Sequence, residues 1–249
     1  MNAEELNRKA VSAGIPRAIM EKDYVLSVVL FHISKSVLAE RMLFKGGTAL
    51  KKVYFPDARF SEDLDFAARA SDERTIMDEL KSLFEDRELK GIRFAFLEKE
   101  RSHAGLRAAL KFSFILGHTQ RIRFDFSFRE NVASKPEKRA IVDEYNLGNA
   151  ELLVIPLEEL FAEKINALFG RIAVRDLYDV WFLFKRGIKA DKLMIKRKFA
   201  YYNEEYEPSK LKGRINLFRK DWKRDLAQFM NDVPDFDGIA DETVKFLEE

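Results

Sequence analysis

Two short motifs within residues 45–66 carry residue types that can handle phosphate and metal ions. Gly46 and Gly47 can bring backbone N–H groups close to an anion, because glycine has no Cβ. Asp63 and Asp65 are separated by one residue, so in an extended strand both carboxylates point to the same face. Two carboxylates on one face can hold a hard divalent cation. The combination indicates metal-assisted phosphoryl or nucleotidyl transfer.

The neighbouring residues extend this candidate site. Thr48 begins a short helical pattern that runs to about residue 54, and its hydroxyl can donate to a phosphate. A strand is predicted at 59–67, with Arg59 and Ser61 on the same face as the aspartates. Both side chains can contact phosphate or hold the carboxylates in place. Glu62 interrupts the apolar alternation, and we interpret it as an exposed residue at a sheet edge.

A third carboxylate lies in an apolar strand further along the chain. The segment RIRFDFSF alternates between apolar and polar residues, and Asp125 is on its polar side. The connection GHTQ predicts a hairpin with residues 106–116. Asp125 alone would fit a solvated sheet face. With two aspartates on a neighbouring element, we predict that it binds metal. The residues predicted to face the core are Ile122, Phe124, Phe126 and Phe128.

Charged residues also interrupt two helical patterns in the second half of the chain. Lys164 lies in EELFAEKINAL, and Asp176 and Asp179 lie in RDLYDVWFL. The two aspartates are three positions apart, so they share a helix face. Residues of this kind are ordinarily solvated, and their positions alone assign them no role.

Composition excludes several classes of function. The absence of cysteine rules out disulfides, thiol catalysis and cysteine-ligated zinc. The histidines have no metal-site spacing, and His32 is predicted to be packed or satisfied by a partner. A formal net charge of +2 indicates no partner by itself. The longest apolar run, at 25–33, is too short to span a bilayer, and the polar N-terminus is unlike a signal peptide. We therefore expect a cytoplasmic protein without membrane contact.

The length of 249 residues and the change in sequence pattern along the chain predict two domains. Turn-forming and charged residues at 131–150 mark the boundary, with a short strand possible at 141–142. After Pro156 the pattern is helical. We therefore expect one domain at 1–150 and another at 151–249. The predicted helices are 3–13, 16–39, 48–54 and 71–90, the last with Ser71 as N-cap, and the predicted strands are 41–44, 59–67, 91–97, 106–116 and 121–128.

The segment 185–224 is strongly basic, with fourteen Lys and Arg against five Asp and Glu. Basic clusters with interleaved aromatic residues can follow a phosphate backbone and stack on unpaired bases. The alternative is a solvated helical surface whose aromatic residues belong to the core. The aromatic residues concerned are Tyr201, Tyr202, Tyr206, Phe218 and Trp222.

Taken in order, these blocks resemble a known family. FKGGTALKK followed by RFSEDLDF, a later strand aspartate in RIRFDFSF, then EELFAEKINAL and RDLYDVWFL are similar to the AbiEii/AbiGii toxin family of nucleotidyltransferases. That family is related to the MenT toxins and falls within the DNA polymerase β-like nucleotidyltransferase superfamily. The segment EKDYVL is similar as well, so the resemblance covers roughly residues 20–185.

The resemblance implies an α+β fold. Its nucleotidyltransferase-like core, with a mixed, mainly antiparallel sheet flanked by helices, would occupy 1–150, including the N-terminal helices. A helical C-terminal domain would follow at 151–249, with the active site in the cleft between the two.

The resemblance also implies roles for matching residues. Asp63 and Asp65 would be catalytic, metal-binding carboxylates, and Lys164 would contact the nucleotide. Asp176 would be catalytic, as a base or as an orienting group, whereas helix packing or capping is equally compatible with Asp179. Asp125 matches less securely, because relatives differ in whether they retain a third carboxylate. The residues expected to bind the nucleotide are Gly46, Gly47, Thr48, Arg59, Ser61 and Lys164.

The function implied is transfer of NMP from ATP, GTP, CTP or UTP to an acceptor, dependent on Mg²⁺ or Mn²⁺. The expected acceptor is RNA such as a tRNA 3′ end, and the protein would act as a toxin paired with a cognate antitoxin. Two alternatives remain open at this point: an antibiotic-type transferase with a small-molecule acceptor, and a noncatalytic nucleotide- or RNA-binding module.

Overall fold

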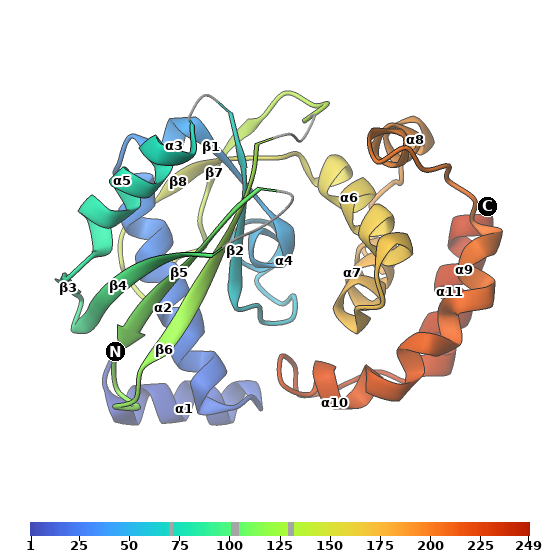
Figure 1. Ribbon diagram of the computed structural model, residues 1–249. Coiled ribbons are helices and arrows are strands. Elements are labelled where there is room, and N and C mark those ends of the chain that lie inside the picture. The colour runs from blue at the N-terminus through green and yellow to red at the C-terminus, as the bar shows by residue number, and fades with distance from the viewer. Residues whose placement is uncertain (70–71, 101–104, 129–131) are drawn as a thin grey trace. The chain divides into compact units, whose positions relative to one another are not determined.

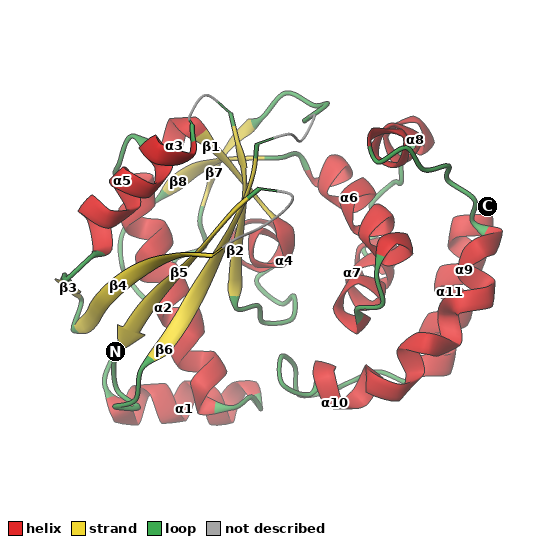
Figure 2. Cartoon of the chain, in the orientation of Figure 1, coloured by secondary structure: helices red, strands yellow, loops and turns green. Residues whose placement is uncertain are grey.

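The computed structural model describes residues 1–69, 72–100, 105–128 and 132–249 (Figure 1). The chain divides into two units, Met1–Ile155 and Pro156–Glu249. The first contains a mixed sheet with flanking helices, and the described elements of the second are helical (Figure 2). This confirms the predicted α+β fold. Within the described ranges, no helix combines the length and apolar character needed to cross a membrane.

In the part of the first unit that the structure describes, eight strands form one sheet with the order β3-β4-β5-β6-β2-β1-β8-β7. The central strand β2 pairs parallel with β6 and antiparallel with β1. The β1–β8 pair is parallel, and the remaining neighbours are antiparallel. The strands are β1 (Met42–Lys45), β2 (Asp63–Ala68), β3 (Glu88–Leu89), β4 (Ile92–Glu100), β5 (Leu106–Ser113), β6 (Gln120–Ser127), β7 (Glu137–Ala140) and β8 (Glu151–Val154).

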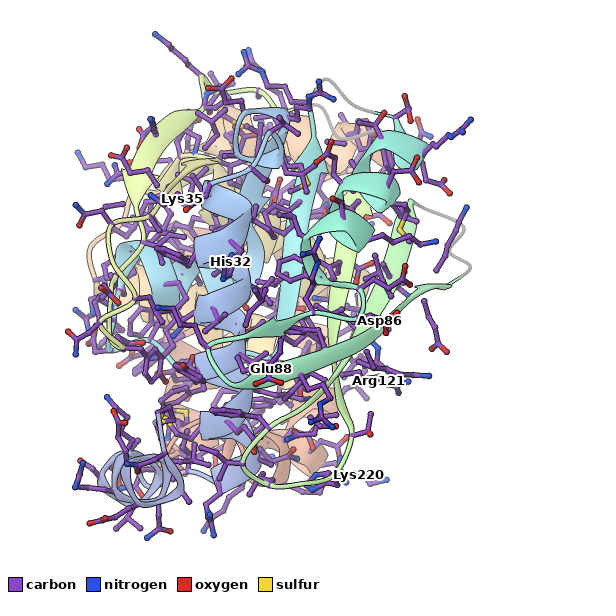
Figure 3. All side chains as sticks on the ribbon, turned by 90° about the vertical axis from the view of Figure 1, so that its left-hand side faces the viewer. His32, Lys35, Asp86, Glu88, Arg121 and Lys220 are labelled. Atoms are coloured by element: carbon purple, nitrogen blue, oxygen red, sulfur yellow. The ribbon has the colours of Figure 1, made fainter. Side chains whose placement is uncertain are left out.

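Helix α2 packs one side of this sheet. Its apolar residues from Val25 to Leu30 are fully buried, as the broad apolar stripe predicts. Seen from the side, α2 and α5 lie side by side, with His32 on α2 (Figure 3). The helices of this unit are α1 (Ala3–Ala13), α2 (Arg17–Ser34), α3 (Leu38–Arg41), α4 (Gly46–Ala49) with a π-helical turn (Leu50–Tyr54), and α5 (Glu73–Phe84).

His32 is packed, as predicted. Its ring meets the ring of Phe31 at 5.5 Å and that of Phe84 at 6.4 Å, both edge to face. Burial lowers the pKa of His32, with a smaller effect in the same direction from Lys90. The residue is therefore part of the contact between α2 and α5.

Two predicted elements are longer than the observed ones. The helix predicted to reach residue 39 ends at Ser34, because the Ser36 hydroxyl donates to the Ile33 carbonyl and accepts from the Leu38 N–H. These bonds offer the backbone an alternative to helix. The helix predicted at 71–90 spans Glu73–Phe84, and its N-cap is Asp72, which accepts from Thr75. The predicted cap, Ser71, lies outside the described residues.

Two other predictions shift in position. The strand expected from residue 59 begins only at Asp63, so Arg59 and Ser61 precede it in an irregular segment. The short strand considered at 141–142 forms at Glu137–Ala140 instead. The predicted hairpin is confirmed as β5 and β6, with Ile122, Phe124 and Phe126 buried and Phe128 half-buried.

The second unit packs its helices around a core of its own. Lys198 on α8 links α8 to α6, because its ammonium group lies 2.6 Å from Glu159 and 2.9 Å from Glu163. The elements are α6 (Leu157–Gly170), α7 (Val174–Lys185), α8 (Lys192–Tyr201), α9 (Ser209–Arg214), a 3₁₀ helix (Ile215–Asp221), α10 (Trp222–Leu226) and α11 (Phe236–Glu248).

Candidate active site

A first group of candidate residues begins on β2. Leu64 and Phe66 are buried, whereas Asp63 and Asp65 alternate with them and are half-buried. A strand alternates its side chains between faces, so the two carboxylates share the face opposite the apolar residues. The predicted carboxylate pair is therefore formed by strand geometry.

Gly46 brings its backbone directly beneath Asp65. A Cβ built on Gly46 would lie 2.1 Å from Oδ2 of Asp65, and the residue has a φ of 77°. Both the space and the backbone conformation therefore favour glycine. The antiparallel register sets this contact, because Lys45 is the partner of Asp65. The glycine motif and the carboxylate motif, which are separated by fifteen residues, meet at one point.

We expect Gly46→Ala to reduce the nucleotidyl transfer predicted from the sequence at least about 100-fold, because the new methyl group displaces the Asp65 carboxylate. The free energy of unfolding should fall by about 2–4 kcal/mol, from the clash and the positive φ together. Gly117→Ala is the matched control, since Gly117 has a φ of 75° and nothing within 4 Å of its Cβ position. It should lose only about 1 kcal/mol and keep its activity. Equal effects at both positions would contradict the assigned contact.

Gly47 faces two polar side chains from the segment before β2. A Cβ at Gly47 would lie 3.2 Å from Nη2 of Arg59 and 3.3 Å from Oγ of Ser61. Both side chains are buried, and Nη1 of Arg59 donates to the Phe60 carbonyl at 3.0 Å. The structure thus places Arg59 and Ser61 beside the glycine pair, although they do not lie on the strand predicted for them.

Thr48 connects the glycine turn to the aspartate strand. Its hydroxyl donates to the backbone carbonyl of Asp63 at 2.5 Å, and the side chain is buried. The hydroxyl proton is therefore used within the protein, and Thr48 fixes the position of Asp63. Its assignment as a phosphate ligand stays a prediction.

Asp125 is the register partner of Asp65 across the parallel β2–β6 pair. Its carboxylate accepts from Nε of Arg107 at 2.6 Å. Across the described residues, no group of three or more His, Cys, Asp or Glu side chains could hold a metal ion. The three-carboxylate metal site therefore stays a prediction. Asp63 and Asp65 nevertheless fit Mg²⁺, which proteins commonly bind through one or two carboxylates together with substrate phosphates.

A second group of candidate residues forms a charged cluster between α6 and α7. Nζ of Lys164 lies 3.3 Å from Oδ1 of Asp176 and 2.8 Å from Oδ2 of Asp179. Nε of Arg171 lies 2.7 Å from Oδ2 of Asp176. Asp176 is in the first turn of α7, where the helix dipole also favours a negative charge. The lysine and both aspartates are buried, contrary to the solvated positions ordinary for such residues.

This cluster refines the roles expected of its members. Both oxygens of Asp176 face cations, an arrangement that orients Lys164 and Arg171 and suits a base poorly. Asp179 contacts Lys164 more closely than Asp176 does, so it belongs to the cluster. Sequence reasoning missed Arg171 altogether. The three-residue spacing of the aspartates was the available signal for Asp179.

The structure thus gathers the predicted residues in two groups. In the first unit it brings together Gly46, Gly47, Thr48, Arg59, Ser61, Asp63 and Asp65, with Asp125 on the adjoining strand. In the second unit it brings together Lys164, Asp176 and Asp179. The union of both groups in one cleft stays a prediction.

Comparisons with known proteins bear on both groups. A family model described as "Nucleotidyl transferase AbiEii toxin, Type IV TA system" matches residues 28–242. The match includes both groups of candidate residues. No curated protein gives a significant match to the chain.

Solved structures provide a second comparison. The chain is similar in fold to MenT4, a nucleotidyltransferase toxin from Mycobacterium tuberculosis H37Rv, with a TM-score of 0.77 and 21% identity, over 100% of this chain and 90% of that one. An antigenic nucleotidyltransferase-like protein from Paracoccidioides brasiliensis has a TM-score of 0.40 and 16% identity, over 62% of this chain and 74% of that one. The second likeness is too weak to support an argument.

Proposed function

Because the chain belongs to the AbiEii nucleotidyltransferase toxin family of type IV toxin–antitoxin systems, we propose that it transfers NMP from an NTP to an RNA hydroxyl. The observation that carries this proposal is the contact between Gly46 and the Asp65 carboxylate. It joins a turn that can bind phosphate to a carboxylate pair that can bind metal. Nucleotidyl transfer requires both at the same triphosphate.

In the proposed reaction, the acceptor hydroxyl attacks the α-phosphorus of the NTP, and the bond to the β-phosphate breaks to release pyrophosphate. When bound, Mg²⁺ or Mn²⁺ would neutralise phosphate charge and help to activate the attacking oxygen. Asp63 and Asp65 are the residues that would hold it. The backbone at Gly46 and Gly47, with the Arg59 guanidinium, would orient the phosphates.

Lys164 is the proposed nucleotide contact from the second unit. Its position between Asp176 and Asp179 restrains a side chain that otherwise has many rotamers. A restrained ammonium group can contact a phosphate with little further loss of side-chain conformational entropy. We propose that Asp176 and Asp179 orient Lys164 for this purpose.

A transfer assay tests the proposed function. Purified protein is incubated with Mg²⁺, total tRNA and each of ATP, GTP, CTP and UTP in turn, labelled at the α-phosphate. The expected result is a labelled RNA with one or more of the nucleotides and loss of labelling with EDTA. Labelling of a small molecule such as an aminoglycoside, but of no RNA, would favour the alternative acceptor class. Failure with every acceptor would contradict the proposal.

The acceptor surface is proposed to lie on the basic segment 185–224. Phe218 and Trp222 are buried, and Tyr206 is half-buried with its ring against those of Phe169 and Phe199, so these aromatic residues pack within the second unit. Tyr201 and Tyr202 are different, with 39% and 51% of their surface exposed at the end of α8. Exposed aromatic rings next to cations are suited to unpaired bases.

The structure selects which charges to reverse. Lys210 pairs with Glu207 at 2.7 Å, and Arg214 is half-buried with a bond to the Phe169 carbonyl, so both have structural contacts. Lys196 and Arg197 are exposed on α8, in the turn before Tyr201. Lys196 and Arg197 are therefore better positions than Lys210 and Arg214 for a charge reversal that tests RNA binding.

Lys196→Glu combined with Arg197→Glu is expected to weaken tRNA binding at least about tenfold at low salt and to flatten its salt dependence, because phosphate contacts release counterions. Filter binding across a salt series measures both quantities. Lys245→Glu on α11 reverses one exposed charge outside the basic segment and should have a smaller effect. If the double variant binds tRNA like the wild type, the acceptor surface lies elsewhere.

The remaining proposals concern the cellular role. We propose that the protein acts in the cytoplasm. Because its family description names a toxin–antitoxin system, we also propose that a cognate antitoxin neutralises it. Induced expression should arrest growth, Asp65→Asn should not, and co-expression of the adjacent gene should restore growth. Growth unaffected by the wild-type protein would contradict a toxin role and leave the transferase activity to be judged by the assay above.

A further inference from the structure

Three consecutive residues of α2 contact three separate segments of the first unit. Glu21 and Asp23 are buried, with 0% and 1% of their surface exposed, and Lys22 is half-buried between them. Such charged side chains are rarely buried unless they are paired. Their partners lie in the segments that carry the candidate active site.

Asp23 contacts the turn that follows the glycine pair. Its Oδ2 lies 2.5 Å from Nζ of Lys52, which is fully buried in the π-helical turn, and it accepts from the Tyr145 hydroxyl at 2.6 Å. Glu144 also pairs with Lys52, at 2.8 Å. Burial raises the pKa of Tyr145, and the Asp23 charge adds to this effect, so the phenol stays protonated as a donor. Asp23 therefore fixes the helical turn that begins at Gly46.

Lys51, next to this pair, fixes the segment that precedes β2. Its ammonium group donates to the Pro56 carbonyl at 2.7 Å and lies 4.1 Å from the centre of the Phe60 ring. Burial lowers the pKa of Lys51, against the attraction of Glu144. The two lysines thus connect the glycine turn both to α2 and to the loop that carries Arg59.

Lys22 contacts the residue immediately before the first aspartate. Its Nζ lies 2.8 Å from Oε2 of Glu62, with 20% and 27% of the two side chains exposed. Glu62, expected to be an exposed edge residue, is therefore half-buried and paired. Because Glu62 is bonded directly to Asp63, this ion pair restrains the start of β2.

Glu21 contacts the connection of the β5–β6 hairpin. Its two carboxylate oxygens lie 3.2 and 3.4 Å from the Leu116 N–H. Burial raises the pKa of Glu21, and the hydrogen bond from Leu116 opposes that shift. The ring of Tyr24 stacks on Phe114 of the same connection at 5.4 Å. Through these contacts α2 holds the hairpin that carries Asp125.

Stability alone is a poor reason for these contacts. Buried ion pairs often contribute little net stability, since the loss of hydration offsets the attraction between the charges. Their geometry, by contrast, is well defined, because a displaced charge would be left without its partner. A set of such pairs on one helix is suited to holding separate segments in a fixed relative position.

We propose that Glu21, Lys22 and Asp23 are positioning residues for the nucleotide site. Each restrains one of the segments that must be aligned for transfer: the β5–β6 hairpin, the start of β2 and the helical turn after the glycine pair. The inference rests on the proposed function, because it assigns these residues to that site. They act through the residues they hold and make no contact with substrate themselves.

A charge swap of the half-exposed pair tests the proposal. Lys22→Glu and Glu62→Lys each place like charges together, whereas the double variant restores an attractive pair with the charges exchanged. Each single variant should lower kcat about 10–100-fold and weaken NTP binding by a similar factor. The double variant should recover to within about threefold of the wild type. Because the pair is partly exposed, the melting temperature of every variant should stay within about 4 °C of the wild type.

Lys138 and Glu151 provide the matched control. They form an exposed pair at 3.2 Å between β7 and β8 of the same unit. The same swap there should leave kcat and NTP affinity unchanged. Asp23→Asn is a second test, in which the side chain keeps its size and Lys52 keeps its pair with Glu144. The fall in kcat should again be larger than the change in melting temperature accounts for.

Acceptor labelling and NTP affinity together distinguish failure of the proposed function from failure of the positioning role. If the wild type binds NTP but labels no acceptor, the proposed function fails, and calorimetric NTP affinities of the swap variants still decide the positioning role. If the single variants match the wild type in kcat and NTP affinity, or if the double variant is as impaired as the singles, the positioning role is overturned. A loss that merely follows the melting temperature in all variants would assign the pair to folding.

Discussion

Replacement of Asp65 by asparagine is expected to reduce nucleotidyl transfer at least about a thousandfold with little change in fold. Asparagine has nearly the same shape as aspartate, so the packing over Gly46 is kept. The carboxylate charge, which the metal ion and the phosphates require, is lost. Single-turnover transfer from α-labelled NTP measures the effect, and circular dichroism checks the fold.

The control for this variant is a charge-neutralising change at an exposed helical residue. Asp78 on α5 lies 3.6 Å from Arg74, one turn earlier on the same helix, and both are exposed. Asp78→Asn should therefore leave transfer unchanged. Asp63→Asn should resemble Asp65→Asn, because the two carboxylates share one strand face. Transfer within about tenfold of the wild type in Asp65→Asn would contradict the assignment of the catalytic carboxylates.

For Asp125→Asn, the size of the effect on transfer decides between two roles of the side chain. Its carboxylate is the register partner of Asp65, but it already accepts from Arg107. An effect as large as that of Asp65→Asn would support a third metal ligand. A small effect would indicate that the Arg107 pair is its role.

Local sequence patterns were sufficient to predict the elements that carry the first group of candidate residues. Alternation around Asp63 and Asp65 predicts a shared face, and Gly46 predicts a turn with close approach, since both signals depend on residues within one short segment. The hairpin was equally predictable from its short connection. These features require no knowledge of distant parts of the chain.

Contacts between distant segments were beyond sequence reasoning. The pairing of Asp65 with Asp125 depends on a parallel register that nothing in either strand specifies. Arg59 was placed on a strand, whereas Lys51 holds the preceding loop in an irregular path through the Pro56 carbonyl. The Lys22–Glu62 pair joins residues forty positions apart. Such contacts form only when separate segments pack together, and composition and periodicity do not specify which segments meet.

The family resemblance singled out Lys164 and Asp176, which local patterns alone did not. Lys164 and Asp176 read as ordinary solvated residues on amphipathic helices, yet both are buried. Their charges compensate one another across α6 and α7, and a helical pattern does not show which charge on one helix faces which on the next. The cluster therefore became visible only once the helices were packed.

Lys164→Met is expected to lower the free energy of unfolding by about 3–5 kcal/mol, because it leaves Asp176 and Asp179 buried with one cation fewer. Arg171 remains beside Asp176, whereas Asp179 loses an ammonium group that lies 2.8 Å from its Oδ2. Adding Asp179→Asn should restore part of the lost stability. Urea denaturation of the two variants and the wild type measures this recovery.

The same pair of variants separates a nucleotide-contacting lysine from a structural one. Lys198→Met is the matched control, since Lys198 is also buried between two carboxylates, at 2.6 Å from Glu159 and 2.9 Å from Glu163. Burial acts to lower the pKa of Lys198, but Glu163 and Glu159 outweigh this effect and the pKa is raised. Lys198→Met therefore also removes a positive charge. Its destabilisation should be similar, but its transfer rate should change little under conditions where it is folded. The folded Lys164→Met, Asp179→Asn variant should instead lose transfer at least about 100-fold, because no ammonium group remains for the phosphates. If it transfers nucleotide at the wild-type rate, Lys164 only holds α6 and α7 together, and the catalytic residues are confined to the first unit.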